Sequence, residues 1–177
     1  MRKISLAILL ALGAFMALPS AAADYDWKTS FAKRWKSSIA FTMIVAEAMP
    51  EDGYSYIPPS TATPVERNYA GEMIHIGQFN AGMFGRVSGM KAPEAPAKGT
   101  TDKAAIIKFL NESSEFCAKA LDAITAEQLE KTVSVGKYQM TGREAIEGAY
   151  AHMAHTRGQA EVYLRLKNIL PPPYPFE

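Results

Sequence analysis

Cysteine is almost absent from this sequence: the 177 residues contain one, Cys117. A single cysteine cannot form a disulfide bond within the chain. Cys117 lies inside an apolar stretch with helical periodicity, which predicts a buried and unreactive thiol. A reactive thiol would need an exposed, electropositive setting, and the sequence around Cys117 does not supply one.

The sequence also lacks a polybasic stripe. Its 19 Lys and Arg residues are nearly matched by 18 Asp and Glu residues, which argues against nucleic acid as a partner. It contains no nucleophile elbow, P-loop or dinucleotide-binding fingerprint. There is no internal repeat, and no heptad pattern long enough for a coiled coil.

The long apolar run of the chain is at its N-terminus, where Ile4–Leu18 follows Arg2 and Lys3 and precedes Ala21-Ala22-Ala23. This order is typical of a secretory signal peptide. We therefore expect residues 1–23 to be removed and the protein to be periplasmic or secreted. Without Arg2 and Lys3 the basic count falls from 19 to 17 against 18 acids, a net charge of −1. The alternative is an uncleaved membrane anchor; after cleavage we expect no membrane association.

Residues 24–177 predict one domain with four long amphipathic helices. The first covers 24–48, with Trp27, Phe31, Trp35 and Ile39 on one face, and ends before Pro50. The second is expected from about Thr63, with Pro64 in its first turn, to about residue 88. The third begins at residue 101 or 102, and the fourth runs from about 141 to about 167, where Asn168 can cap it.

Two capping boxes mark further boundaries. Thr125 with Gln128 predicts a short extra helix, and Thr141 with Glu144 predicts the start of the last long helix. Residues 132–139 between them predict an extended connector or a small hairpin. Proline-rich connectors at 49–64 and 89–99 separate the first three helices. The expected fold is all-α, a four-helix bundle.

The chain has three histidines, and two of them lie in the fourth predicted helix. His152 and His155 are three residues apart, close enough to meet on one helix face. Thr156, Gln159 and Tyr163 continue the stripe of His152. The third histidine, His75, lies in the apolar second helix. Imidazoles from two helices of a bundle can form an open transition-metal site.

The chain resembles the DinB-like (DinB/YfiT) superfamily of bacterial four-helix bundles along its whole mature length. The matching segments are residues 48–52, 72–76, 140–144 and 152–165, followed by the prolines at 171–173. The resemblance implies long crossover loops. It also implies a divalent metal, zinc or nickel, bound by one histidine of the second helix and two of a His-x-x-x-His motif in the last.

Residue by residue, the implied ligands fall on His75, His152 and Thr156, which is not a histidine. Three interpretations follow. A metal is bound by His75 and His152 with His155, Thr156 or water completing the set; or the site binds metal weakly or not at all; or the pocket binds a small molecule without metal. Threonine is a poor zinc ligand beside imidazole.

The neighbouring polar side chains have two interpretations each. Arg157 and Gln159 could orient a substrate, but Arg157 is better explained by an ion pair with Glu161, four residues on. Gln159 and Tyr163 could instead be interior polar groups that satisfy each other. Glu72 and Gln78 flank His75 and could support it, or could lie on the surface.

The resemblance implies two classes of function. The first is a metal-dependent transferase or hydrolase, in characterised relatives a thiol-dependent one. The second is a non-catalytic bundle that has lost this chemistry. Export argues against the first class, because low-molecular-weight thiols are mainly cytoplasmic, and the substitution at Thr156 argues the same way. The expectation is an exported DinB-like domain with residual metal binding; relatives are often homodimers.

Overall fold

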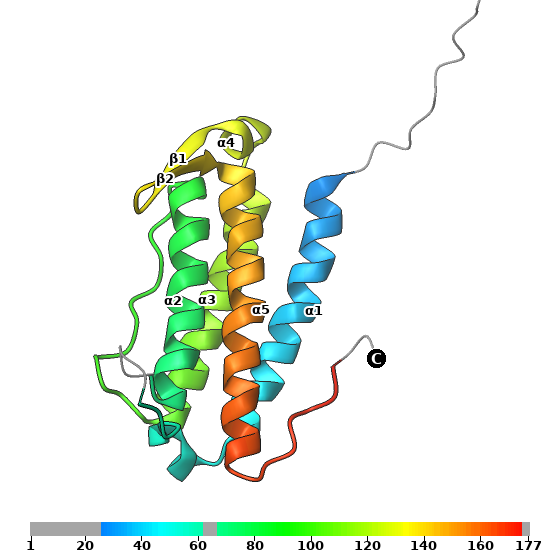
Figure 1. Ribbon diagram of the computed structural model, residues 1–177. Coiled ribbons are helices and arrows are strands. Elements are labelled where there is room, and N and C mark those ends of the chain that lie inside the picture. Colours follow the sequence, from blue (N-terminus) through cyan, green and yellow to red (C-terminus); the bar gives the residue numbers. More distant parts are fainter. Residues whose placement is uncertain (1–25, 62–66, 175–177) are drawn as a thin grey trace, which may run out of the picture.

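The computed structural model describes residues 26–61 and 67–174. Four long helices form a bundle (Figure 1), as the sequence predicted. They are α1 (Trp27–Ala48), α2 (Tyr69–Ser88), α3 (Lys103–Ala123) and α5 (Gly142–Leu166). The predicted signal peptide lies outside the described residues. Within the described part of the chain, no helix combines the length and apolar character needed to cross a membrane.

Each long helix begins at a polar side chain that accepts a hydrogen bond from a free N–H of the first turn. These N-cap residues are Asp26, Asn68, Asp102 and Thr141. The predicted start of the second helix near Thr63 lies outside the described residues, and the helix that the structure describes begins at Tyr69. Arg67 and Asn68 precede the helix, and the Asn68 side chain accepts the Gly71 N–H at 2.8 Å. The sequence pattern favoured a proline start, but the prediction for Pro64 falls outside the described residues.

Helices α2 and α3 run in the same direction, so the connector between them returns along the whole bundle (Figure 1). By contrast, α1 and α2 meet at one end, where the 3₁₀ helix η1 (Glu51–Ser55) lies. Tyr54 fixes this end: it is fully buried, and its hydroxyl donates to the Ala46 carbonyl at 2.8 Å. Ile57, in the connector that follows, is 47% exposed.

The other end of the bundle is covered by a short helix and a hairpin. The capping box of Thr125 opens α4 (Ala126–Glu130), as predicted. Strands β1 (Thr132–Val135) and β2 (Tyr138–Thr141) pair antiparallel, so the hairpin alternative was correct. The second capping box then starts α5 directly from β2.

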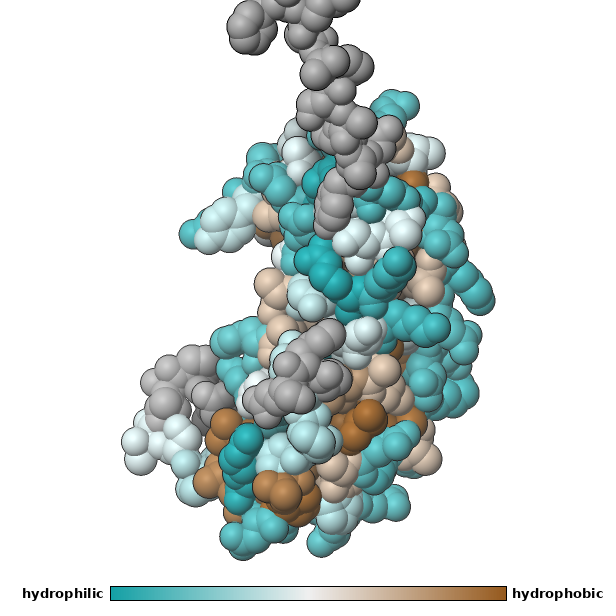
Figure 2. All heavy atoms as spheres, turned by 90° about the vertical axis from the view of Figure 1, so that its right-hand side faces the viewer, coloured by the Kyte–Doolittle hydropathy of each residue, from teal (hydrophilic) through white to brown (hydrophobic). Residues whose placement is uncertain are grey.

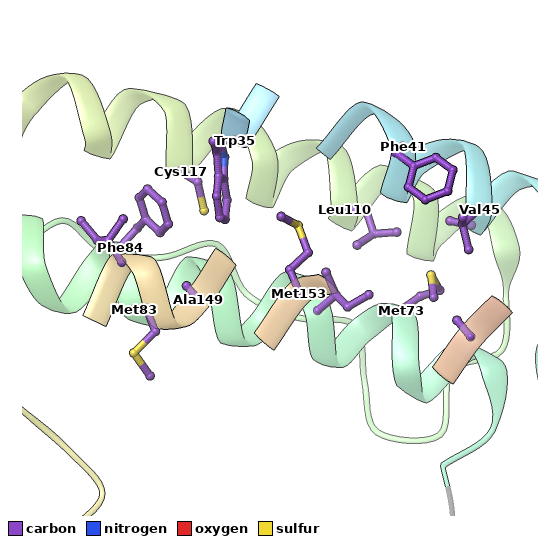
Figure 3. Close-up of a cluster of buried hydrophobic side chains, with 14 of the residues drawn as sticks. Trp35, Phe41, Val45, Met73, Met83, Phe84, Leu110, Cys117, Ala149 and Met153 are labelled. Carbon is purple, nitrogen blue, oxygen red and sulfur yellow. The ribbon is translucent and has the colours of Figure 1, made fainter. Parts of the chain in front are cut away.

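The core runs the length of the bundle (Figure 3). Phe31 and Trp35 of the predicted α1 stripe are 1% and 3% exposed, and Trp35 packs against Phe84 with ring centroids 4.6 Å apart. Cys117 is fully buried, and burial raises the pKa of its thiol far above the usual range. This confirms that the cysteine is buried, and a raised pKa disfavours the reactive thiolate form.

Apolar side chains are also exposed at the end of the bundle where α1 and α5 finish. Figure 2 shows hydrophobic surface, coloured brown, in the lower part of the face that it presents. The exposed residues from this end of the two helices and the segment after α5 are Ile44, Val162, Leu166 and Leu170.

Candidate functional site

Two of the three histidines meet between α2 and α5. The two helices are antiparallel neighbours, which places His75 opposite His152 although 77 positions separate them in sequence. Their Nε2 atoms are 3.0 Å apart, and the ring planes are inclined at 73°. The pair therefore converges on one point through the nitrogens that bind metals or share a proton.

The side chain of Phe79 packs against the imidazole of His152. Its ring stacks on that of His152 with centroids 3.7 Å apart and planes 14° from parallel. It lies one turn after His75 on α2, so one helix supplies both the partner and the stacking surface. The Nδ1 atom of His152 is buried and has no hydrogen-bond partner among the described residues. A metal-binding histidine usually has a partner at this second nitrogen.

Burial favours the neutral form of both imidazoles. It is the main cause that lowers the pKa of His75, and the charge of Arg67 lowers it further. Burial also lowers the pKa of His152 to about 4, followed by the effects of His75, His155 and Arg67. Neutral imidazole is the form that binds a metal ion.

The spacing of the pair suits a shared ion, but the ligand set is short. Two imidazole nitrogens at about 2.05 Å from a tetrahedral ion lie about 3.3 Å apart, close to the 3.0 Å between His75 and His152. His155 is exposed, and Thr156 is 2% exposed. Across residues 26–61 and 67–174, no three His, Cys, Asp or Glu side chains form a group that could hold a metal.

Arg157, proposed to line the site, points toward α1 instead. Its Nη1 donates to the Ser38 carbonyl at 3.1 Å, to Ser38 Oγ at 2.9 Å and to Thr42 Oγ1 at 3.1 Å. The predicted pairing with Glu161 is confirmed, with Nε 3.8 Å from Oε1. The shorter contacts show that Arg157 mainly fastens α5 to α1.

The other predicted site residues do not lie together at one site. Gln159 is exposed, so its interpretation as an interior group was wrong: a polar position on the stripe of His152 need not face the core. Tyr163 is 5% exposed, and its hydroxyl donates to the Arg67 carbonyl at 2.9 Å. Of the residues flanking His75, Gln78 is exposed and Glu72 is 1% exposed.

Sequence reasoning missed Phe79 and Arg67. Phe79 could have been found, because it follows His75 by four residues and so shares its helix face. Arg67 could not, because it precedes α2 and reaches the site through tertiary structure. Its Nη1 lies 3.5 Å from Glu72 Oε1. Arg67, His75 and Gln78 also line an open groove of about 650 Å³ beside the segment 96–99.

A family model described as the DinB superfamily matches residues 34–160, well over half of the chain. The chain belongs to the DinB superfamily. The matched region includes both members of the histidine pair and Thr156. This confirms the resemblance seen in the sequence. A comparison with curated proteins found no match to the chain.

Solved structures of DinB-like proteins share this fold. One from Bacillus subtilis is 22% identical, with a TM-score of 0.65, and the match covers 82% of this chain and 97% of the other. One from Bacillus cereus is 17% identical, with a TM-score of 0.69, covering 82% and 95%. At these identities the DinB-like fold is what the structures have in common with this protein.

Proposed function

We propose that this DinB-like protein is exported and binds one divalent metal ion, zinc or nickel, weakly through His75 and His152. The observation that carries the proposal is the 3.0 Å between the two Nε2 atoms. Both imidazoles are held neutral, as ligands must be. Two protein ligands leave positions open for water or a small ligand from the groove beside His75.

A bound ion here would act as a Lewis acid and lower the pKa of a water or thiol bound to it. The protein itself would contribute two neutral imidazoles, the stacking ring of Phe79 and the nearby charge of Arg67. A small-molecule ligand in the groove belongs to the same proposal. Transferase or hydrolase activity would require that ligand to reach the open positions.

A second candidate is a non-catalytic bundle without metal. It is favoured by the buried Nδ1 of His152, which has, among the residues that the structure describes, no partner of the kind that normally orients a metal ligand. In this case the 3.0 Å contact is a hydrogen bond between two neutral imidazoles, one of which donates.

Metal analysis separates these candidates. The mature chain is purified and titrated with Zn²⁺ and with Ni²⁺ by calorimetry. We expect one weak site in the wild type that is lost in His75→Ala and in His152→Ala. Thr156→His should bind the ion at least roughly tenfold more tightly, because it supplies a third imidazole.

His155→Ala is the matched control, since it removes an exposed histidine from the same helix. It should bind metal like the wild type. Equal loss of binding in His155→Ala and His75→Ala would contradict a site of two histidines. If the wild type binds no metal and Thr156→His gains a site, the second candidate is correct.

A further inference from the structure

Two polar side chains lie in the core between α1, α2 and α3, away from the histidine pair. Asn80 of α2 and Ser113 of α3 are each 2% exposed. Asn80 Oδ1 and Ser113 Oγ have no hydrogen-bond partner within the described part of the chain. A buried polar atom left in this state lowers the stability of the fold. Two such atoms in one core therefore require an explanation.

Both side chains line the same small cavity. Its volume is about 10 Å³, which is at the lower limit of the roughly 10–15 Å³ that a cavity needs to hold one buried water. No charged residue lines it, so an ion in this cavity would be buried without a charged partner, which is costly. Apart from Asn80 and Ser113, the lining residues are Ile39, Thr42, Met43, Ile76, Gly77, Leu110, Ser114 and Cys117.

The cavity lies where α2 and α3 approach each other closely. A Cβ atom on Gly77 would lie 2.7 Å from Phe109 Cε1 and 3.2 Å from Ser113 Oγ. Glycine at this position lets the two backbones come together. Ser113 is thereby held against α2, while Asn80 comes from the next turn of α2.

Helix α1 contributes the third polar group, a hydroxyl. Thr42 of α1 also lines the cavity. Its hydroxyl donates to the Ser38 carbonyl at 2.8 Å and accepts from Arg157 at 3.1 Å. An oxygen of this type has two lone pairs, so one more bond can be accepted. Three helices thus supply polar groups to a space the size of one molecule.

We propose that this cavity is a binding site for one structural water molecule. The water donates to Asn80 Oδ1, bonds the Ser113 hydroxyl and takes Thr42 as its third partner. Buried waters typically make about three hydrogen bonds of this kind. Together with Arg157, the water joins α1 to the rest of the bundle through polar contacts.

Nuclear magnetic resonance tests the site directly. In the wild type we expect cross-relaxation between a long-lived water and the methyl protons of Ile76 and Leu110, which line the cavity. The signal should persist in Ser114→Ala, the control on the neighbouring residue, and vanish in Asn80→Leu/Ser113→Ala. Its absence in the wild type would overturn the proposal.

A double-mutant cycle gives a second measurement. Ser113→Ala and Asn80→Leu should each lower the ratio of folded to unfolded protein by roughly tenfold, because each leaves the water or its partner unsatisfied. The double variant should lose no more than the larger single loss, since both groups serve one water. Strictly additive losses of stability would show that Asn80 and Ser113 do not share a water molecule.

Discussion

Arg157 shows how one side chain can take a structural role inside a motif that suggests chemistry. Its sequence context, directly after Thr156, fits a residue that orients substrate. In the structure it is 5% exposed and lies over the Phe41 ring, with Cζ 4.7 Å from the centroid. Its donors are used by Ser38 and Thr42 of α1. Its role is to fix the position of α1 relative to α5.

Replacing Arg157 should therefore destabilise the fold. Arg157→Met removes the donor that serves Ser38 and Thr42 and leaves buried acceptors unsatisfied. We expect the free energy of unfolding to fall by about 2–3 kcal/mol. Urea denaturation measures this loss. Arg165→Met, on the exposed last turn of the same helix, is the control and should change stability by less than about 0.5 kcal/mol.

The histidine pair predicts acid sensitivity. Burial lowers the folded-state pKa of His152 to about 4, from the ordinary histidine value of 6.5, and the pKa of His75 is also lowered. The unfolded state therefore binds more protons in this range, and stability falls as pH decreases from 6.5 toward 4. For His152 the loss is at most about 3 kcal/mol. Urea denaturation against pH, with a chelator present, measures it.

His152→Gln removes this titration and should flatten the profile between pH 6.5 and 4. His155→Gln removes an exposed histidine from the same helix and should keep the wild-type slope. Carboxylates with lowered pKa values, such as Glu144, act at lower pH in all three proteins. An unchanged slope in His152→Gln would show that the pair does not stay neutral in the fold.

At the scale of the element, α5 is defined by its two ends. Thr141 and Glu144 begin it with a capping box. At the other end Asn168 adopts the left-handed conformation, with φ 59°, and the Ile169 N–H returns to the Leu164 carbonyl at 2.9 Å. Both ends follow from local chemistry, which explains why the sequence predicted them.

Two glycines of α5 should respond oppositely to alanine. At Gly142 a Cβ would lie 2.3 Å from the Gln128 carbonyl oxygen, whereas at Gly148 nothing lies within 4 Å. Gly148→Ala should stabilise the protein by about 0.5–1 kcal/mol, because alanine is the better helix former. Gly142→Ala should destabilise it, since backbone must move. Thermal unfolding of both variants measures the difference, and equal shifts would contradict the close approach of α4.

At the scale of the molecule, the ends of α1 are tied to its neighbours. Lys28 donates to the carbonyls of Asp122, in the last turn of α3, and of Ile124, its C-cap residue, at 2.6 and 3.0 Å. Lys103 at the start of α3 donates to the Glu47 and Met49 carbonyls, both at 2.8 Å. These bonds cap carbonyls at the ends of both helices with a cation, which is favourable there.

The start of the first helix bears on the expected export of the protein. The first helix of the bundle begins at Trp27, capped by Asp26, so cleavage after Ala23 leaves the domain whole. We expect mass spectrometry of the protein from a periplasmic or culture fraction to show an N-terminal peptide that starts at Asp24. A chain that keeps residues 1–23 in the membrane fraction would support the anchor instead.

The sequence by itself determined the four long helices and the short extra helix. It left a hairpin as one of two alternatives for residues 132–139, and it named three histidines as candidate ligands. Periodicity and capping are local properties, written within a few residues of each helix end. The start of α2 was not predicted, because Pro64 is a better-known signal for a helix start than Asn68, which caps the helix. The contacts of Arg157 with Ser38 and Thr42 were not predicted, because these residues lie more than 100 positions away in sequence.

Only the tertiary structure decided which residues meet. It brought His75 and His152 to 3.0 Å, left His155 exposed and turned Arg157 toward α1. The physical reason is helix rotation. A shift of one residue turns a side chain by about 100°, and the packing of whole faces sets that rotation. No pattern within a single helix contains this information.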